Sequence, residues 1–98
     1  MDSKTKVLVI DDDVNICELI KLYMEKEGFE VMTVYSGKKS MESFTSFAPN
    51  IIILDIMLPG ADGWQICREI RKISNIPIIM LTAKGETFDK VLGLELGA

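Results

Sequence analysis

The sequence contains no histidine and only two cysteines, and both shortages limit the chemistry open to it. Without histidine the chain has no His-based zinc site, no Ser-His or Cys-His nucleophile and no phosphohistidine of its own. Cys17 and Cys67 are too few and too far apart for a disulfide framework, and each falls in an apolar helical stripe. We therefore expect two reduced thiols in the core of a cytosolic protein.

Clusters of basic residues and long apolar runs are missing as well. The 11 basic and 15 acidic residues give a net charge of −4, which disfavours direct contact of this segment with nucleic acid. No apolar run is long enough to cross a membrane, and the polar N-terminus leads directly into a predicted strand, so no signal peptide is expected. With 98 residues, 48% of them hydrophobic, the composition is typical of one soluble globular domain.

Four short apolar runs alternate with stretches of helical periodicity. Runs rich in β-branched residues are typical of strands that a parallel sheet buries on both faces. The predicted strands span residues 6–10, 29–34, 50–54 and 77–81, and the predicted helices span residues 14–27, 36–47, 63–73 and 86–96. Four βα units joined by short loops indicate a doubly wound α/β sheet in one domain, residues 1–98.

Local signals add detail to the helices. In the first helix, apolar residues recur at helical spacing: Ile16, Leu19, Ile20 and Tyr23. Ser36 is expected to cap the second helix and Asp62 the third, because a side-chain oxygen at that position accepts from free amides of the first turn. Asp13 is expected to be a charge that the dipole of the first helix favours. Residues 57–61, which include a proline and a glycine, are predicted to form a loop.

Acidic residues follow two of the predicted strands. Asp11 and Asp12 come directly after the first strand and Asp55 after the third, while Thr82 ends the fourth. Ligands of open parallel sheets bind at the carboxyl ends of the strands, so these side chains are expected to share one pocket. Clustered carboxylates repel one another unless a cation lies among them, and oxygen ligands select Mg²⁺, Mn²⁺ or Ca²⁺. A carboxylate beside such a cation can attack a phosphoryl group and form an aspartyl phosphate, and a hydroxyl such as that of Thr82 can donate to a phosphoryl oxygen.

Three stretches, VLVIDDDVN, IIILDIMLPGADGW and PIIMLTAKGE, resemble in order and spacing the receiver domain of two-component response regulators. The resemblance runs from the first strand to the last residue of the sequence. LPGADGW and LGLELGA are most similar to the subfamily whose receivers precede a winged-helix, OmpR/PhoB-like DNA-binding domain. The resemblance therefore implies a regulator of transcription whose DNA-binding domain lies outside this sequence.

The same resemblance implies a fold of flavodoxin-like type. The family has five βα units, so this chain would form a sheet in the order 2-1-3-4, with the fifth strand and its helix absent. We therefore expect a fragment of a longer regulator. Its fourth strand, Ile78–Leu81, would be an exposed apolar edge, which favours a homodimer or an exchange of segments between two chains.

A metal site is also implied by the resemblance. Asp12 would ligate Mg²⁺ directly, with Mn²⁺ as an alternative ion, and Asp11 would hold the ion through water or support its shell. The backbone carbonyl of Met57 and the carboxylate of Asp55 would complete the protein ligands.

For the phosphoryl group, the resemblance implies that a sensor histidine kinase transfers it to Asp55. Thr82 would bind the phosphoryl group, and the small Ala83 would leave the approach open. In this family the residues that match Met57 and Lys84 tune the hydrolysis of the acyl phosphate. Such a receiver is a cytoplasmic phospho-acceptor with autodephosphorylation, and it is not a turnover enzyme.

Three alternatives stay open at this point. A fragment that ends before the family's lysine on the fifth strand could fold and bind Mg²⁺ and partners without accepting a phosphoryl group. A haloacid-dehalogenase-type phosphatase also uses an Asp nucleophile after a strand, but it needs a second acid two residues on, where this chain has Met57. A flavin module of flavodoxin type needs a phosphate-binding loop after the first strand, where three aspartates would repel the phosphate.

Overall fold

The computed structural model describes residues 4–58 and 61–81, so the predicted helix 86–96 lies outside the described residues. The elements along the chain are β1 (Lys6–Ile10), α1 (Val14–Lys26), β2 (Glu30–Val34), the 3₁₀ helix η1 (Gly37–Lys39), α2 (Ser40–Phe47), β3 (Ile51–Asp55), β4 (Met57–Leu58), β5 (Ala61–Asp62), α3 (Gly63–Arg71) and β6 (Ile78–Leu81).

Four of the strands form one parallel sheet in the order β2-β1-β3-β6. β1 pairs with β2 from Lys6↔Glu30 to Ile10↔Val34 and with β3 from Val7↔Ile51 to Ile10↔Leu54. β6 joins the other side of β3, where the last pair is Asp55↔Leu81. This confirms the predicted α/β fold with the flavodoxin-like order 2-1-3-4, in which β6 is the fourth strand of the sheet.

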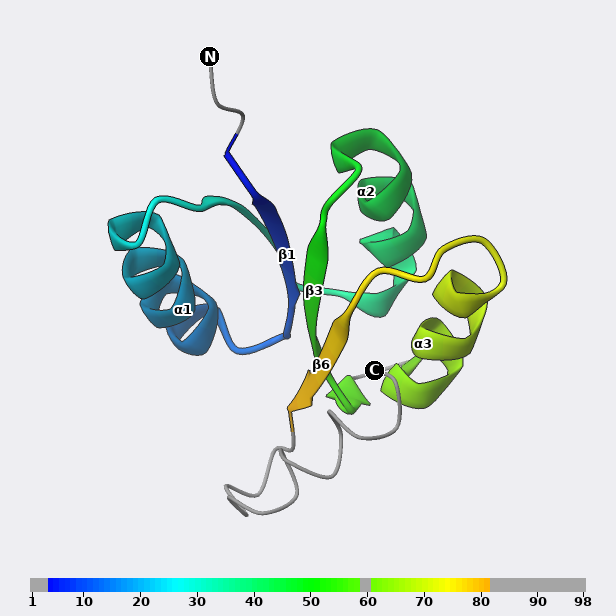
Figure 1. Ribbon diagram of the computed structural model, residues 1–98. Coiled ribbons are helices and arrows are strands. Elements are labelled where there is room, and N and C mark those ends of the chain that lie inside the picture. Colours follow the sequence, from blue (N-terminus) through cyan, green and yellow to red (C-terminus); the bar gives the residue numbers. More distant parts are fainter. Residues whose placement is uncertain (1–3, 59–60, 82–98) are drawn as a thin grey trace.

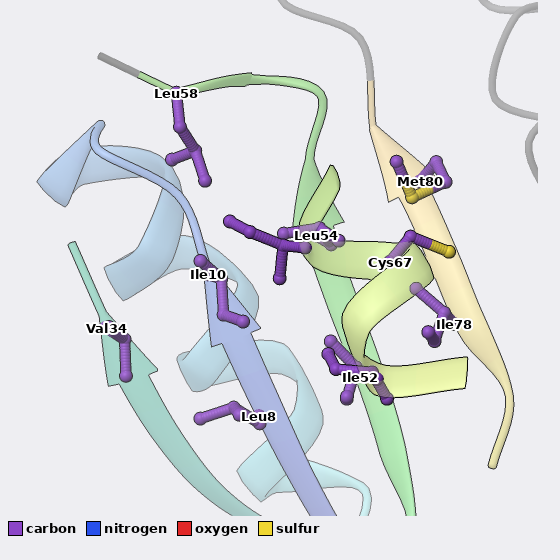
Figure 2. Packing of buried hydrophobic residues seen from close by; sticks show 11 residues of the cluster. Leu8, Ile10, Val34, Ile52, Leu54, Leu58, Cys67, Ile78 and Met80 are labelled. Atoms are coloured by element: carbon purple, nitrogen blue, oxygen red, sulfur yellow. The ribbon is translucent and has the colours of Figure 1, made fainter. Parts of the chain in front are cut away.

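The described helices are distributed unequally over the two faces of the sheet (Figure 1). α2 and α3 lie on one face and α1 lies on the other. The larger core cluster fills the space beneath α2 and α3, and Figure 2 shows how its side chains from β1, β3 and β6 meet those from α3. Its buried members are Leu8, Ile10, Val34, Ile52, Leu54, Leu58, Ile66, Cys67, Ile70, Ile78 and Met80.

The smaller cluster joins α1 to the opposite face of the sheet. Cys17 is fully buried there, and Ile20 and Met24 pack against the same cluster. Ile20 thus packs inward, but three other apolar residues of α1 do not: Ile16, Leu19 and Tyr23 are 42%, 54% and 61% exposed. The helix packs mainly on β2 and β1.

The expectation that Ser36 caps the second helix is wrong. Ser36 precedes η1 and makes no capping hydrogen bond with its side chain, and α2 begins only at Ser40. Ser40 is fully buried and its hydroxyl donates to the carbonyl of Gly37 over 2.7 Å. α2 ends at Phe47, and its C-cap, Ala48, has a left-handed backbone with φ 53°. The turn before α2 is therefore stabilised by the hydrogen bond from the Ser40 hydroxyl to η1, and not by a cap at Ser36.

The segment predicted as a loop contains two short strands. β4 and β5 pair antiparallel, with Met57↔Asp62 and Leu58↔Ala61. Asp62 also caps α3, as predicted, because its Oδ1 accepts from the Trp64 amide over 3.0 Å. The described residues on either side of positions 59–60 are therefore paired with one another.

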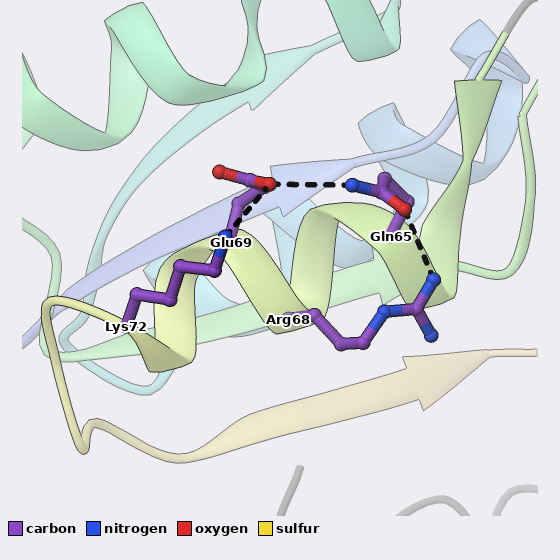
Figure 3. A network of polar contacts seen from close by, with 4 residues as sticks. All are labelled: Gln65, Arg68, Glu69 and Lys72. Atoms are coloured by element: carbon purple, nitrogen blue, oxygen red, sulfur yellow. Dashed lines mark hydrogen bonds and ion pairs between the residues drawn. The ribbon is translucent and has the colours of Figure 1, made fainter.

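The outer surface of α3 carries a short polar network (Figure 3). Gln65 donates to Glu69 over 3.2 Å and accepts from Arg68 over 3.0 Å. Lys72 forms an ion pair with Glu69 over 3.5 Å. Pairs this exposed contribute about 0–1 kcal/mol each, so the network marks the solvent side of α3 and does little for the fold.

None of the helices in the described residues is long and apolar enough to span a membrane.

Candidate metal and phosphoryl site

The register of the sheet brings the acidic residues of two strands together. The last pair of β1 and β3 is Ile10↔Leu54, so the residues that follow, Asp11 just after β1 and Asp55 at the end of β3, lie side by side. Parallel strands run in the same direction, and their carboxyl ends therefore meet at one edge.

Carboxylate oxygens of three residues gather at this edge. One oxygen each from Asp11, Asp12 and Asp55 lies within 4.8 Å of the other two, and this is the group of possible metal ligands found in the described part of the chain. Asp11 and Asp55 are buried, with 5% and 4% of their surface exposed, whereas Asp12 is exposed. The site thus has two carboxylates fixed in the protein and one that opens to solvent.

Asp11 is held by groups from three parts of the fold. Its amide donates to the carbonyl of Val34 at the end of β2 over 3.0 Å. Its Oδ1 accepts from the Asp13 amide over 2.9 Å, and its carbonyl accepts from the Cys17 thiol over 3.2 Å. The position of this carboxylate therefore depends on β2 and on α1 as well as on its own strand.

The environment of Asp11 disfavours its charged form. Burial raises the pKa of the Asp11 carboxyl from 3.8 to about 6; the hydrogen bond from Asp13 opposes this, and the charges of Asp55, Asp12 and Asp13 add to it. Burial likewise raises the pKa of the Cys17 thiol to about 11, with Asp11 and Asp13 contributing. Cys17 is therefore a neutral thiol at neutral pH, which agrees with the expected reduced core cysteine.

Asp13 has the separate role that the sequence suggested. It is the N-cap of α1, and its Oδ1 accepts from the amides of Asn15 and Ile16 over 3.0 and 3.2 Å. A carboxylate already bound to two amides at a helix N-terminus is placed for capping. Of the three consecutive aspartates, two belong to the carboxylate cluster with Asp55 and one caps the helix.

The hairpin after Asp55 is tied to the sheet and to α3. The Ile56 amide donates to the carbonyl of Leu81 over 2.9 Å, and the Gly63 amide donates to the carbonyl of Ile56 over 3.0 Å. Gly63 is buried, and a Cβ built on it would lie 2.6 Å from the Cα of Ile56. The main chain that carries Asp55 therefore lies directly against the first residue of α3.

The donor set suits a hard divalent cation. Three carboxylates at this spacing offer the oxygen ligands that Mg²⁺, Mn²⁺ and Ca²⁺ prefer, and a cation would offset the repulsion that helps to raise the pKa of Asp11. The backbone of Met57, the fourth predicted ligand, is in β4, two residues after Asp55.

Two predicted site residues, Thr82 and Ala83, lie outside the described residues. Two structural features of the site were absent from our sequence interpretation: the Cys17 contact with Asp11 and the close approach of Gly63 to the main chain of Asp55. A glycine directly after a capping aspartate was the available signal for the second.

Comparison with known proteins agrees with this architecture. The family described as response regulator receiver domain matches residues 7–98. The BeF3-activated N-terminal receiver domain of Klebsiella pneumoniae RstA is 34% identical, with a TM-score of 0.82 over 96% of this chain and 80% of that one. A receiver domain protein of Clostridium thermocellum is 35% identical (TM-score 0.81, 96% and 77% covered), and the Francisella response regulator 1452 receiver domain is 33% identical (TM-score 0.81, 97% and 79% covered). With its parallel sheet, its acidic edge and a family match over almost its whole length, the chain belongs to the response regulator receiver domain family.

Proposed function

We propose that this chain accepts a phosphoryl group on Asp55 from a sensor histidine kinase, with Mg²⁺ bound by the neighbouring carboxylates. Receiver domains in general are signalling phospho-acceptors that interact with histidine kinases. The observation that carries the proposal is the cluster of Asp11, Asp12 and Asp55, whose oxygens lie within 4.8 Å of one another. In the proposed role the chain is a cytoplasmic signalling protein and not a turnover enzyme.

Each carboxylate would have its own task. Asp12 would bind the cation directly from the solvent side, and the buried Asp11 would hold it through water or support its shell. Asp55 and the carbonyl of Met57 would complete the ligands. When bound, the cation would supply positive charge that neutralises the phosphoryl oxygens, and Mn²⁺ would serve in place of Mg²⁺.

The transfer itself needs a nucleophile and a leaving group. A carboxylate oxygen of Asp55 would form a bond to phosphorus while the bond between phosphorus and the donor breaks, and the donor's imidazole keeps the electron pair. These 98 residues contain no histidine, so the donor imidazole would come from outside this sequence. Thr82 would donate a hydrogen bond to a phosphoryl oxygen, Ala83 would leave room for it, and Lys84 with Met57 would tune hydrolysis of the product.

Two contact surfaces are part of the proposal. The apolar side chains of Ile16, Leu19 and Tyr23 are exposed on α1, the helix that begins directly after the acidic run, and an exposed apolar surface of this kind is suited to docking a kinase. Within the described residues β6 pairs only with β3, and its other side is available for pairing with a second chain or for exchange of segments. The similarity to the RstA receiver and the LPGADGW stretch support an output domain of the winged-helix, DNA-binding type.

Intact-mass measurement after incubation with acetyl phosphate tests the proposal. We expect the wild type to gain one phosphoryl group in Mg²⁺ and none in EDTA, and the adduct to be released by hydroxylamine, which cleaves acyl phosphates. Asp55→Asn should gain nothing, while Asp62→Asn, which changes a capping carboxylate outside the cluster, should react like the wild type.

Other outcomes of the same experiment would support the alternative hypotheses. A folded protein that binds Mg²⁺ and gains no mass is a receiver that binds without accepting phosphate, and our proposal is then wrong. A protein that releases inorganic phosphate from many equivalents of acetyl phosphate and at no time carries a phosphoryl adduct on Asp55 would instead act as a phosphatase, for which Met57 occupies the position of the second acid.

A further inference from the structure

Gly63 occupies a position in which the backbone of the phospho-acceptor loop leaves no room for a side chain. A Cβ at this residue would lie 2.6 Å from the Cα of Ile56 and 2.9 Å from its carbonyl oxygen, and closer still to the carbonyl oxygen of Asp55. All three atoms belong to the main chain, so no side-chain rotation can relieve the contact. Either α3 or the backbone at Asp55 would have to move.

We propose that Gly63 is a positioning residue for Asp55, and that its missing side chain lets α3 support the main chain of the metal and phosphoryl site. This inference rests on the function proposed above and adds a residue that does not touch the ligand. Gly63 donates its amide to the carbonyl of Ile56 over 3.0 Å, which fixes the distance between α3 and the loop. The same loop contains Met57, whose carbonyl is a proposed ligand.

The loop has few ways to absorb a displacement. At one end Ile56 is bonded to Leu81 of β6 over 2.9 Å, and at the other Met57 pairs with Asp62 in the short β4–β5 hairpin. Asp62 in turn caps α3. A shift at Gly63 is therefore passed to Asp55 and Met57, and a misplacement of about 1 Å is enough to weaken an oriented site.

The steric argument and helix propensity predict opposite effects for Gly63→Ala. Alanine is the best helix former and glycine one of the poorest, so propensity alone predicts a more stable α3 and an unchanged site. Our inference predicts instead that Gly63→Ala weakens Mg²⁺ binding at least about 10-fold, the loss that is typical when an outer-shell support of a metal site is removed. The rate of phosphoryl uptake from acetyl phosphate at saturating Mg²⁺ should fall as well.

Gly28→Ala is the matched control variant. Gly28 has φ +96°, and a Cβ there would meet nothing within 4 Å. An alanine at that φ has a strained backbone and lowers stability, but its Cβ does not collide with any other residue. Gly28 lies in the turn between α1 and β2, far along the chain from Asp55. Its Mg²⁺ affinity, measured by calorimetric titration, should stay within about 2-fold of the wild type. The same titration of Gly63→Ala supports the inference if the affinity falls about 10-fold, and overturns it if the affinity stays within 2-fold.

Two further experiments apply if Gly63→Ala folds poorly: a double variant and a measurement on the wild type. Ala48→Gly relieves a left-handed backbone at the end of α2 and should restore the lost stability without touching the site. If the affinity of Gly63→Ala/Ala48→Gly returns to that of the wild type, Gly63 is merely structural. In the wild type, amide exchange of Gly63 should slow more than that of Gly28 on addition of Mg²⁺ and beryllofluoride, and equal changes would overturn the inference. A wild type that binds no Mg²⁺ contradicts the proposed function before any variant is made.

Discussion

The ionisation of Asp11 makes the stability of the fold depend on pH. Burial raises its pKa from 3.8 to about 6, so the folded chain binds this proton more tightly than the unfolded chain does. Such a carboxyl stabilises the fold below its unfolded pKa, and this contribution is lost as the pH rises through the folded pKa. For Asp11 the loss falls in the window from 3.8 to about 6.

We predict that Asp11→Asn raises the free energy of unfolding of the metal-free protein near neutral pH and changes it less near pH 4. The amide keeps the oxygen that accepts from Asp13 and cannot ionise, so the cost of a buried charge disappears. Urea unfolding in EDTA at the two pH values measures the difference. An Asp11→Asn protein that is less stable than the wild type near neutral pH would show that the pKa of Asp11 is not raised.

Asp12→Asn is the control for this prediction, because Asp12 is exposed and belongs to the same cluster. Its effect on the metal-free protein should be smaller than that of Asp11→Asn. With Mg²⁺ present, the wild type should become more stable than Asp11→Asn, because the wild type has the complete carboxylate cluster. A ligand stabilises the folded state that binds it by about 2.7 kcal/mol at 100 times its Kd.

At the scale of the element, α1 depends on the cap that precedes it. Asp13→Ala should lower the free energy of unfolding by about 1 kcal/mol, because two amides of the first turn lose their acceptor. Asp13→Asn keeps an acceptor oxygen at the same place and should cost much less. Urea unfolding of both variants measures the pair, and equal losses would mean that the charge of Asp13, rather than its hydrogen bonds, stabilises α1.

The end of α2 offers a change of the opposite sign. Ala48 has φ 53° and ψ 62°, a left-handed backbone that glycine adopts without steric cost. Ala48→Gly should therefore raise the free energy of unfolding by roughly 1 kcal/mol. Thermal and urea unfolding check the prediction, with Gly28→Ala as a variant that should lose stability for the same physical reason.

The strands were predictable because buried β-branched runs are visible in the sequence. The run 6–10 is β1. β2 and β6 each begin one residue later than predicted, and β3 is shifted by one residue at both ends, so that it includes Asp55. The inward face of α1 was harder to predict. Cys17 and Met24 turn toward β1 and β2 while Leu19 and Tyr23 do not, and that choice depends on which strands the helix crosses rather than on its own spacing.

The candidate site was predictable in its residues and not in its electrostatics. Asp11, Asp12 and Asp55 follow from their places at strand ends, since parallel strands share an edge. The different burial of Asp11 and Asp12 depends on contacts with Val34 and Cys17, which other elements supply. Likewise the missing cap at Ser36 reflects η1, whose turn is closed by the buried hydroxyl of Ser40.

On the scale of the whole molecule, the described helices cover the sheet more completely on the side of α2 and α3 than on the side of α1. The exposed apolar side chains of α1 and the free side of β6 within the described residues give the molecule two surfaces on which a second chain could pack. We predict that the protein associates with itself as its concentration rises, and sedimentation velocity over a range of concentrations measures this.

Replacing Leu19 and Tyr23 by glutamate and lysine, respectively, should shift the sedimentation profile toward the monomer. Ile73→Lys is the matched control, since Ile73 is equally exposed, at 63%, and lies beyond α3. A wild type that stays a folded monomer at high concentration would mean that neither surface binds a second copy.

The pairing of β1 with β3 also has a kinetic consequence. The two halves of the carboxylate cluster lie far apart in the sequence and meet only when Ile10 stands opposite Leu54. Closing so long a loop is slow, and a slip of one residue would turn Asp55 toward the other face of the sheet. A bound cation would therefore stabilise only those states of the chain in which β1 and β3 are already paired in register. It would not stabilise states in which the two strands are unpaired or out of register.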